Sequence, residues 1–85
     1  MAATFEAAKV AVREIVLELS ESEEVVVEDT ELLLSGLLDS MAVVQVVATM
    51  EQCLDQEVPP LDITIENFET LGAMFNYVAA RLQAS

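Results

Sequence analysis

Two long segments of the chain place their apolar residues at the spacing of an amphipathic helix. The first runs from about residue 4 to residue 20, where Thr4 can cap the helix and Glu6 lies favourably in the first turn. The second runs from about residue 40 to residue 55 and contains neither Gly nor Pro. Buried stripes are predicted in the first helix at Phe5, Ala8, Val12, Ile15 or Val16, and Leu19, and in the second at Val43, Val47, Met50 and Leu54.

The second segment could also be read as a strand, because its many valines have a high strand propensity. It is long for a strand, however, and polar residues recur within it at Gln45, Thr49 and Gln52. Its length and these polar positions therefore favour a helix.

Beyond residue 55, prolines and threonines mark the element boundaries. Pro59-Pro60 ends the second helix and begins an extended connection. Thr64 can cap a short helical piece over residues 65–69, and Thr70 can cap a last helix. Three main helices and one short helix predict an all-α bundle. The last helix is predicted to bury Leu71, Met74 or Phe75, Val78 and Leu82.

The helical pattern fails between residues 20 and 38, where acidic residues alternate with aliphatic clusters and Gly36 interrupts the sequence. A stretch of this length is long for a loop without structure. A small domain needs the burial that its aliphatic residues provide. We therefore expect four residues of this loop to pack partly against the core, namely Val25, Val27, Leu32 and Leu33.

Length and composition indicate one small domain. The 85 residues, 54% of them hydrophobic, allow a single domain over residues 1–85 with one core. No apolar run approaches the ~20 residues that span a bilayer, and the N-terminus lacks the pattern of a signal peptide. Cys53 is the only cysteine, which fits a reducing compartment. We therefore expect a cytoplasmic protein. Short tails favour a discrete protein, although an excised domain would look similar.

The charge balance narrows the possible partners. Sixteen acidic residues against three basic ones give a formal net charge of −13, which repels nucleic acid and anionic membranes and attracts basic protein surfaces. With no histidine and one cysteine, the chain lacks a zinc-ligand set, and its acidic runs are typical of a solvated loop. We expect no catalytic residue, no metal site, no binding of nucleic acid, no insertion into membranes, and a monomer.

The segment Leu38-Asp39-Ser40-Met41 offers the clearest candidate chemistry. It places a serine at or next to the start of the second helix, between aliphatic residues. A serine nucleophile needs an adjacent base, and the chain has no histidine to provide one. Ser40 is therefore either an ordinary helix cap or a serine that another protein modifies.

The order of these features resembles the acyl carrier protein family, which includes peptidyl and aminoacyl carrier domains. A long acidic loop leads to Gly36-Leu37-Leu38-Asp39-Ser40-Met41, and an amphipathic helix, a proline-containing connection, a short helix and a final helix follow. The resemblance spans about residues 5–82. It implies a small four-helix acyl-carrier-like bundle, with three main helices, one short helix and a long first loop.

By this resemblance, a phosphopantetheinyl transferase esterifies Ser40 with 4′-phosphopantetheine taken from coenzyme A. The thiol of that arm then carries acyl or aminoacyl thioesters between partner enzymes. The start of a helix can accommodate the phosphodiester, because its free N–H groups and its dipole favour an anion. The transferase supplies a magnesium ion and a base. Asp39 would lie near that metal, with Leu38 and Met41 as apolar contacts on either side of Ser40.

The motif departs from the pattern of carriers in fatty acid synthesis, which usually have leucine after the serine and acidic residues soon afterwards. Here Met41 follows the serine, and the first charge after Ser40 is Glu51. The run is similar to stand-alone aminoacyl carriers, such as D-alanyl carrier proteins, and to peptidyl carriers. We expect an apolar to neutral docking surface for partner enzymes at Leu38, Met41, Ala42, Val43, Gln45 and Val46.

Three hypotheses about function follow. The favoured one is a discrete carrier that an adenylating ligase loads with an amino acid or another carboxylic acid, and that passes its cargo to a downstream acyl transferase or synthase. The first alternative is an acyl carrier protein of fatty acid or polyketide synthesis. The second is an unmodified acidic helical interaction module in which Ser40 only caps the helix.

Overall fold

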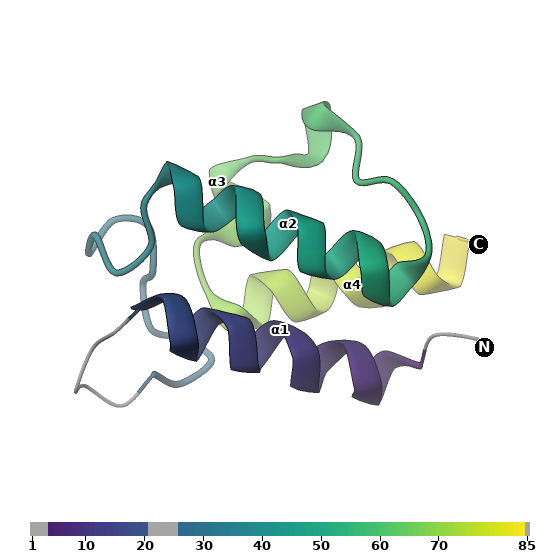
Figure 1. Cartoon of the computed structure of the whole chain (residues 1–85), viewed down its shortest axis with the longest axis horizontal. Helices are drawn as coiled ribbons and strands as arrows, with labels where there is room; N and C mark the ends of the chain where they lie inside the picture. Colours follow the sequence, from purple (N-terminus) through teal and green to yellow (C-terminus); the bar gives the residue numbers. More distant parts are fainter. Residues whose placement is uncertain (1–3, 21–25, 85) are drawn as a thin grey trace.

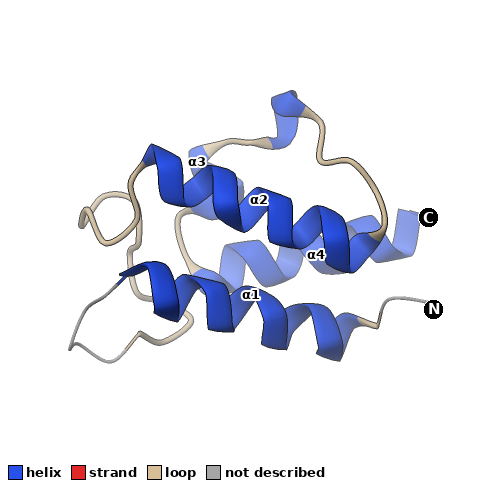
Figure 2. Cartoon of the chain, viewed as in Figure 1, coloured by secondary structure: helices blue, strands red, loops and turns tan. Residues whose placement is uncertain are grey.

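The computed structural model describes residues 4–20 and 26–84, and all regular elements in these ranges are helical (Figure 2). α1 runs antiparallel to α2 and α4, whereas α2 and α4 point in the same direction (Figure 1). The predicted all-α bundle, with three main helices, one short helix and a long first loop, is confirmed. The elements are α1 (Phe5–Ser20), α2 (Ser40–Leu54), the 3-10 turn η1 (Pro60–Asp62), α3 (Ile65–Phe68) and α4 (Leu71–Ala84).

Threonine caps fix where three of the helices begin. Thr4, Thr64 and Thr70 each accept a hydrogen bond through Oγ1 from the backbone N–H three residues later, at 3.1, 3.3 and 3.0 Å. Each cap satisfies an N–H group that has no acceptor within its own helix. All three threonines are the caps that the sequence predicts.

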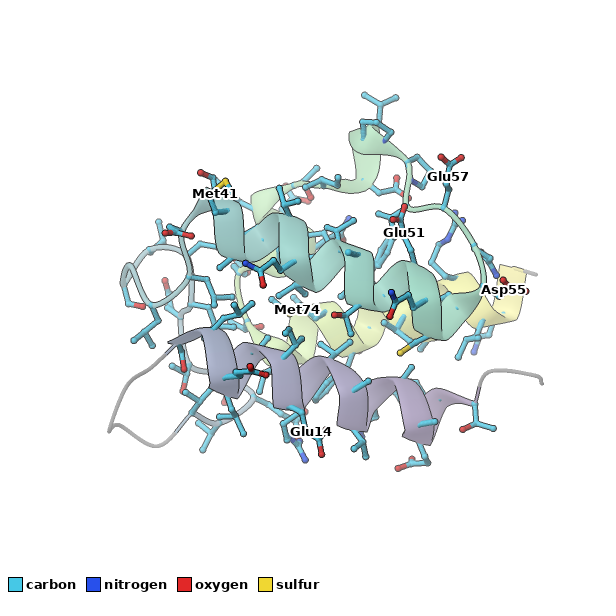
Figure 3. All side chains as sticks on the ribbon, viewed as in Figure 1. Glu14, Met41, Glu51, Asp55, Glu57 and Met74 are labelled. Carbon is cyan, nitrogen blue, oxygen red and sulfur yellow. The ribbon has the colours of Figure 1, made fainter. Side chains whose placement is uncertain are left out.

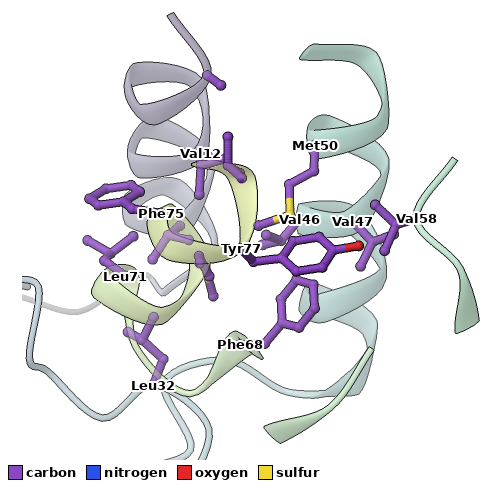
Figure 4. Close-up of a cluster of buried hydrophobic side chains, with 14 of the residues drawn as sticks. Val12, Leu32, Val46, Val47, Met50, Val58, Phe68, Leu71, Phe75 and Tyr77 are labelled. Carbon is purple, nitrogen blue, oxygen red and sulfur yellow. The ribbon is translucent and has the colours of Figure 1, made fainter. Parts of the chain in front are cut away.

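The core lies between α1, α2 and α4, and α3 packs against α4 at one end of it (Figure 4). The stripes predicted for α1 and α4 are buried along most of their length and half-buried at Phe5, Leu19 and Leu82. Tyr77 is a further core residue that the pattern did not mark. On α2 the buried face is shifted towards Ala42 and Val46, which leaves Val43 only half-buried. The predicted residues of α2 that are buried are Val47, Met50 and Leu54.

The first loop buries some of the residues expected to pack against the core. Leu32 is fully buried and Leu33 is half-buried, as predicted. Val27 is 55% exposed, so that expectation is wrong. The reason is a surface turn, in which Val27 N–H donates to Thr30 Oγ1 at 3.0 Å and Thr30 N–H donates back to Val27 O at 3.1 Å. Val25 lies outside the described residues.

The connection between α2 and α3 is more ordered than the predicted extended segment. Pro59 is extended, but Pro60 begins the turn η1, where its fixed φ suits a first helical position. Asp62 joins this turn to α4, because its Oδ2 accepts a hydrogen bond from Tyr77 Oη at 2.7 Å and lies 3.9 Å from Arg81 Nη1. Burial and the bond to Asp62 raise the pKa of Tyr77 to about 12.

Within the described residues, no helix is long and apolar enough to cross a membrane.

Candidate functional site

Residues 32–38 form a closed loop whose two ends lie in the core. Leu32 is fully buried and Leu38 is 2% exposed, and Leu38 N–H donates to Leu32 O at 2.9 Å. Between them Gly36 turns the chain at φ +81°, a left-handed conformation that glycine adopts without a steric penalty. Because both ends of the loop are fixed in the core, the chain leaves the core at a defined point, directly before α2.

Backbone hydrogen bonds fasten this loop to the junction of α3 and α4. Leu32 N–H donates to Glu69 O at 2.8 Å, and Gly72 N–H donates to Glu28 O at 3.1 Å. The second bond satisfies an N–H group in the first turn of α4, which has no acceptor within the helix. The junction of α3 and α4 therefore helps to fix the position at which α2 begins.

Asp39 is the N-cap of α2. Its backbone is extended, at φ −94° and ψ −178°, and its Oδ1 accepts a hydrogen bond from Ala42 N–H at 2.8 Å. Ser40 is the first residue of the helix, next to the cap. The interpretation of Ser40 as an ordinary cap is therefore wrong, because the aspartate immediately before it performs that task.

The side chain of Ser40 is exposed, and its hydroxyl makes no hydrogen bond to any residue that the structure describes. Two other serine hydroxyls are engaged: Ser20 Oγ donates to Leu17 O at 3.1 Å, and Ser35 Oγ donates to Glu31 O. No described side chain is in hydrogen-bond contact with Ser40 to act as its base. The arrangement thus offers a free hydroxyl to an external enzyme but does not activate that hydroxyl.

The start of the helix also offers backbone donors beside this hydroxyl. Within the described residues, the N–H groups of Ser40 and Met41 have no hydrogen-bond acceptor, since the cap of Asp39 reaches only Ala42 and Val43. Free N–H groups and the dipole at the start of a helix favour an anion. The site therefore suits a phosphate ester on the Ser40 hydroxyl.

The three basic residues of the chain lie on α1 and α4, and none lies on α2. Lys9 Nζ is 5.1 Å from the centroid of the Phe75 ring, and the Arg13 guanidinium carbon is 5.4 Å from it, so both cations lie against the pair of α1 and α4. Arg81, the third, faces Asp62. No charged residue occurs between Asp39 and Glu51, so most of α2 is neutral in a very acidic protein.

Three of the six residues predicted to form the docking surface are core residues instead. Leu38, Ala42 and Val46 are 2%, 7% and 0% exposed, so the prediction that they contact partners is wrong. The helical period turns Ala42 and Val46 to the same inward face as Met50, and Leu38 closes the loop before the helix.

The other three predicted docking residues remain accessible. Met41 is 69% exposed at the outer edge of the bundle (Figure 3), Gln45 is exposed and Val43 is half-buried. Val44, which is 63% exposed, lies on the same helix and was not among the predicted residues. The helical period could have identified Val44 as outward-facing, because it lies on the same face as Met41 and Ala48. Val46, Val47 and Met50 lie on the opposite face.

A comparison with protein families agrees with this geometry. The family model described as "Phosphopantetheine attachment site" matches residues 10–78, which include the first loop, α2 and the candidate serine. No curated protein and no solved structure matches the chain. Because the match covers most of the chain, the protein belongs to this family of carrier proteins, which hold 4′-phosphopantetheine on a serine.

Proposed function

We propose that Ser40 is the serine that carries 4′-phosphopantetheine. Four serines lie within the matched residues 10–78, and Ser22 is outside the described part of the chain. The hydroxyls of Ser20 and Ser35 are occupied by backbone carbonyls, whereas that of Ser40 is exposed and free of such contacts. This free hydroxyl at the first position of α2 is the observation that carries the proposal.

Members of this family are not catalysts, and a phosphopantetheinyl transferase modifies them. In that reaction Ser40 Oγ gives up its proton to a base of the transferase and forms an ester bond to the pantetheine-bearing phosphorus of coenzyme A. The pyrophosphate bond of coenzyme A breaks in the same step, and adenosine 3′,5′-bisphosphate leaves. The residues of this chain present the hydroxyl and offer the free N–H groups of Ser40 and Met41 to the phosphate. Asp39 holds the helix start in place and adds a carboxylate beside the magnesium ion of the transferase.

The cargo that we propose is an amino acid or another carboxylic acid, loaded by an adenylating ligase and passed to a downstream acyl transferase or synthase. The neutral stretch of α2 between Asp39 and Glu51 supports this choice, because it resembles aminoacyl and peptidyl carriers. We place the protein in the cytoplasm, since the arm carries a thiol and Cys53 is a free cysteine, and a reducing compartment preserves both.

Intact mass after incubation with coenzyme A, magnesium and a broad-specificity phosphopantetheinyl transferase tests the attachment site. We expect the wild type and Ser35→Ala each to gain one phosphopantetheine, and Ser40→Ala to gain none. Modification of Ser40→Ala would move the arm to another serine. If several transferases left the wild type unmodified, the unmodified interaction module would become the better interpretation.

The modified protein then separates the two kinds of cargo. We expect a gain of one aminoacyl group when it is incubated with ATP, an amino acid and an adenylating ligase of the D-alanyl or peptide-synthetase type. Incubation with malonyl-coenzyme A and a malonyl transferase serves as the comparison. Loading by the malonyl transferase alone would favour the carrier of fatty acid or polyketide synthesis.

The remaining docking surface, defined by Met41, Val43, Val44 and Gln45, is also a proposal. An acidic residue placed there would have to lose its water against the apolar contact of a partner. We expect Met41→Glu to raise the KM for modification by the transferase. Val10→Glu, a matched change at an exposed position of α1, should leave that KM near the wild-type value. Equal effects of both variants would argue against this surface.

A further inference from the structure

The methionines that the structure describes lie in two very different environments. Met50 and Met74 are 0% exposed, and Met50 packs in the core beside Val46 (Figure 4). Met41 is 69% exposed and lies at the outer edge of the bundle, with its sulfur towards the solvent (Figure 3). A small oxidant in the solvent therefore reaches the sulfur of Met41 directly, whereas it reaches the other two sulfur atoms only when the core opens.

The remaining sulfur atom of the described residues belongs to Cys53, which is half-buried. Its free thiol packs against the buried core cluster. Cys53 lies near the end of α2 and Met41 near its start, and a helix rises about 1.5 Å per residue, so the two residues are about 18 Å apart along the axis. Met41 is thus the exposed sulfur group close to Ser40.

Met41 directly follows the proposed attachment residue. Ser40 and Met41 are the first two residues of α2, and no charged residue follows before Glu51. The thioether of methionine is an apolar group that an apolar contact of an enzyme can cover. Its oxidised form, the sulfoxide, is polar and chiral. A polar group loses free energy when it is buried without a new hydrogen bond, so the sulfoxide disfavours the approach of an enzyme to Ser40.

The oxidation needs no group of this chain besides the thioether. The sulfur lone pair attacks one oxygen of hydrogen peroxide, and an S–O bond forms as the O–O bond breaks. The sulfur loses two electrons, the peroxide gains them, and the second oxygen leaves as water with both hydrogen atoms of the peroxide. Leucine, the usual residue after the serine in carriers of fatty acid synthesis, has no lone pair and does not react in this way.

We propose that Met41 is an oxidation site through which hydrogen peroxide controls the attachment of phosphopantetheine to Ser40. The sulfoxide weakens binding of the transferase to the unmodified chain, and methionine sulfoxide reductases restore it. Peroxide also oxidises free thiols, so a chain that stays without its arm is spared oxidation of the arm thiol. The inference rests on the proposed function and adds the condition under which the arm is attached.

Peptide mapping by mass spectrometry tests the site of oxidation. The unmodified full chain is treated with hydrogen peroxide, and catalase then removes the oxidant. We expect Met41 to gain one oxygen at least about tenfold faster than Met50 or Met74, which react only when the core opens. Met1 lies outside the described residues, and its own peptide reports its oxidation separately. Oxidation of the two buried methionines as fast as Met41 would overturn the proposal.

The kinetics of modification test the consequence. With a broad-specificity phosphopantetheinyl transferase, coenzyme A and magnesium, the KM of each treated protein is divided by the KM of the same protein before treatment. We expect a ratio of about threefold or more for the wild type and for Cys53→Ala. The ratio should be near one for Met41→Leu, which keeps an apolar side chain without sulfur. A ratio near one in the wild type, or an equal rise in Met41→Leu, would overturn the proposal.

Reversal tests whether the sulfoxide itself causes the effect. The oxidised wild type is incubated with dithiothreitol and two methionine sulfoxide reductases, one for each sulfoxide epimer. We expect the oxygen to leave Met41 and the KM to return to the untreated value. A KM that stays raised after Met41 has lost its oxygen would assign the effect to another lesion and overturn the proposal.

The untreated samples distinguish this inference from the proposed function. An untreated wild type that is never modified, or an untreated Ser40→Ala variant that is, contradicts the attachment at Ser40 itself. Normal modification of the untreated protein, with an unchanged KM after oxidation of Met41, contradicts only the control by peroxide.

Discussion

At the scale of single residues, the start of α2 divides two tasks between neighbouring side chains. The carboxylate of Asp39 caps the helix, and the hydroxyl of Ser40 is left without a structural partner among the described residues. A serine that capped its own helix would have to give up that hydrogen bond when it was esterified. Because Asp39 holds the cap instead, modification of Ser40 leaves the hydrogen bonds of the helix start intact.

This division predicts that alanine at position 39 destabilises the protein, whereas alanine at position 40 does not. Asp39→Ala removes the cap and should lower the free energy of unfolding by about 0.5–2 kcal/mol, whereas Asp39→Asn keeps a capping oxygen and should remain near the wild type. Ser40→Ala removes only an exposed hydroxyl, so its change should stay within about 0.5 kcal/mol. Urea unfolding of the three unmodified variants measures these values. A loss in Ser40→Ala equal to that in Asp39→Ala would contradict the assignment of the cap.

The sequence identified the residue at the site better than its surroundings. Ser40 stood out because no histidine exists to activate it and because an aspartate and a glycine-containing loop precede it. The docking residues were predicted by their closeness to Ser40 in the sequence, but proximity does not say which way a helical side chain points. The helical period turns Ala42 and Val46 inward, and it turns Val44, which was not among the predicted residues, outward.

At the scale of elements, the first loop depends on one buried side chain. Leu32 is fully buried beside Leu71 (Figure 4), and its backbone bonds both Glu69 and Leu38. Two positions later, Leu34 is 73% exposed. The same residue type in one loop thus serves as an anchor at one position and as a surface residue at the other.

Truncation of these two leucines should have very different effects. Leu32→Ala leaves a cavity in the core and should lower the free energy of unfolding by about 2–5 kcal/mol. Leu34→Ala loses almost no burial and should stay within about 0.5 kcal/mol of the wild type. Chemical denaturation followed by circular dichroism gives both values. Similar stabilities of the two variants would mean that Leu32 does not anchor the loop.

The connection from α2 to α3 yields a prediction for alkaline pH. Burial and the bond to Asp62 raise the pKa of Tyr77 from 10.0 to about 12, so the fold favours the protonated phenol. This contribution to stability is complete below pH 10 and is lost as the pH rises through about 12. We therefore expect the wild type to lose stability over this range more steeply than Tyr77→Phe, which has no phenol to ionise.

Tyr77 is the only tyrosine, so the ultraviolet absorbance of the phenolate reports its ionisation directly. The midpoint should lie near pH 12 in the folded protein and fall to about 10 in denaturant. Asp62→Asn, which removes the charge but leaves the ring buried, should lie between them. A folded midpoint equal to the denatured one would contradict the bond between Tyr77 and Asp62.

Local signals explain which elements could be predicted. The three threonine caps and the apolar stripes of α1 and α4 are properties of neighbouring residues, and they gave those helices nearly to the residue. The turn η1 was not predicted, because its order comes from contacts with Tyr77 and Arg81, 15 and 19 positions later in the chain. Tertiary contacts of this kind leave no pattern in the local sequence.

At the scale of the whole molecule, repulsion among the acidic side chains opposes the compact state that burial of apolar residues stabilises. The net charge of −13 is carried by a chain in which the buried residues are hydrophobic and, among the described residues, one ion pair joins Arg81 to Asp62. Lys9 and Arg13 lie over aromatic rings. The acidic residues therefore mostly repel one another across the surface, and folding brings them closer together.

Salt should consequently stabilise this protein. Sodium chloride at about 0.5 M shortens the screening length well below the ~10 Å of 0.1 M salt. This weakens the repulsion among exposed carboxylates more than it weakens the half-buried ion pair of Arg81 and Asp62. We expect the melting temperature to rise between low salt and 0.5 M at neutral pH. Near pH 4.1, where the net charge of the sequence vanishes, the same addition should have little effect if the fold persists there. A melting temperature that falls with salt at neutral pH would show that attractive charge contacts dominate the fold.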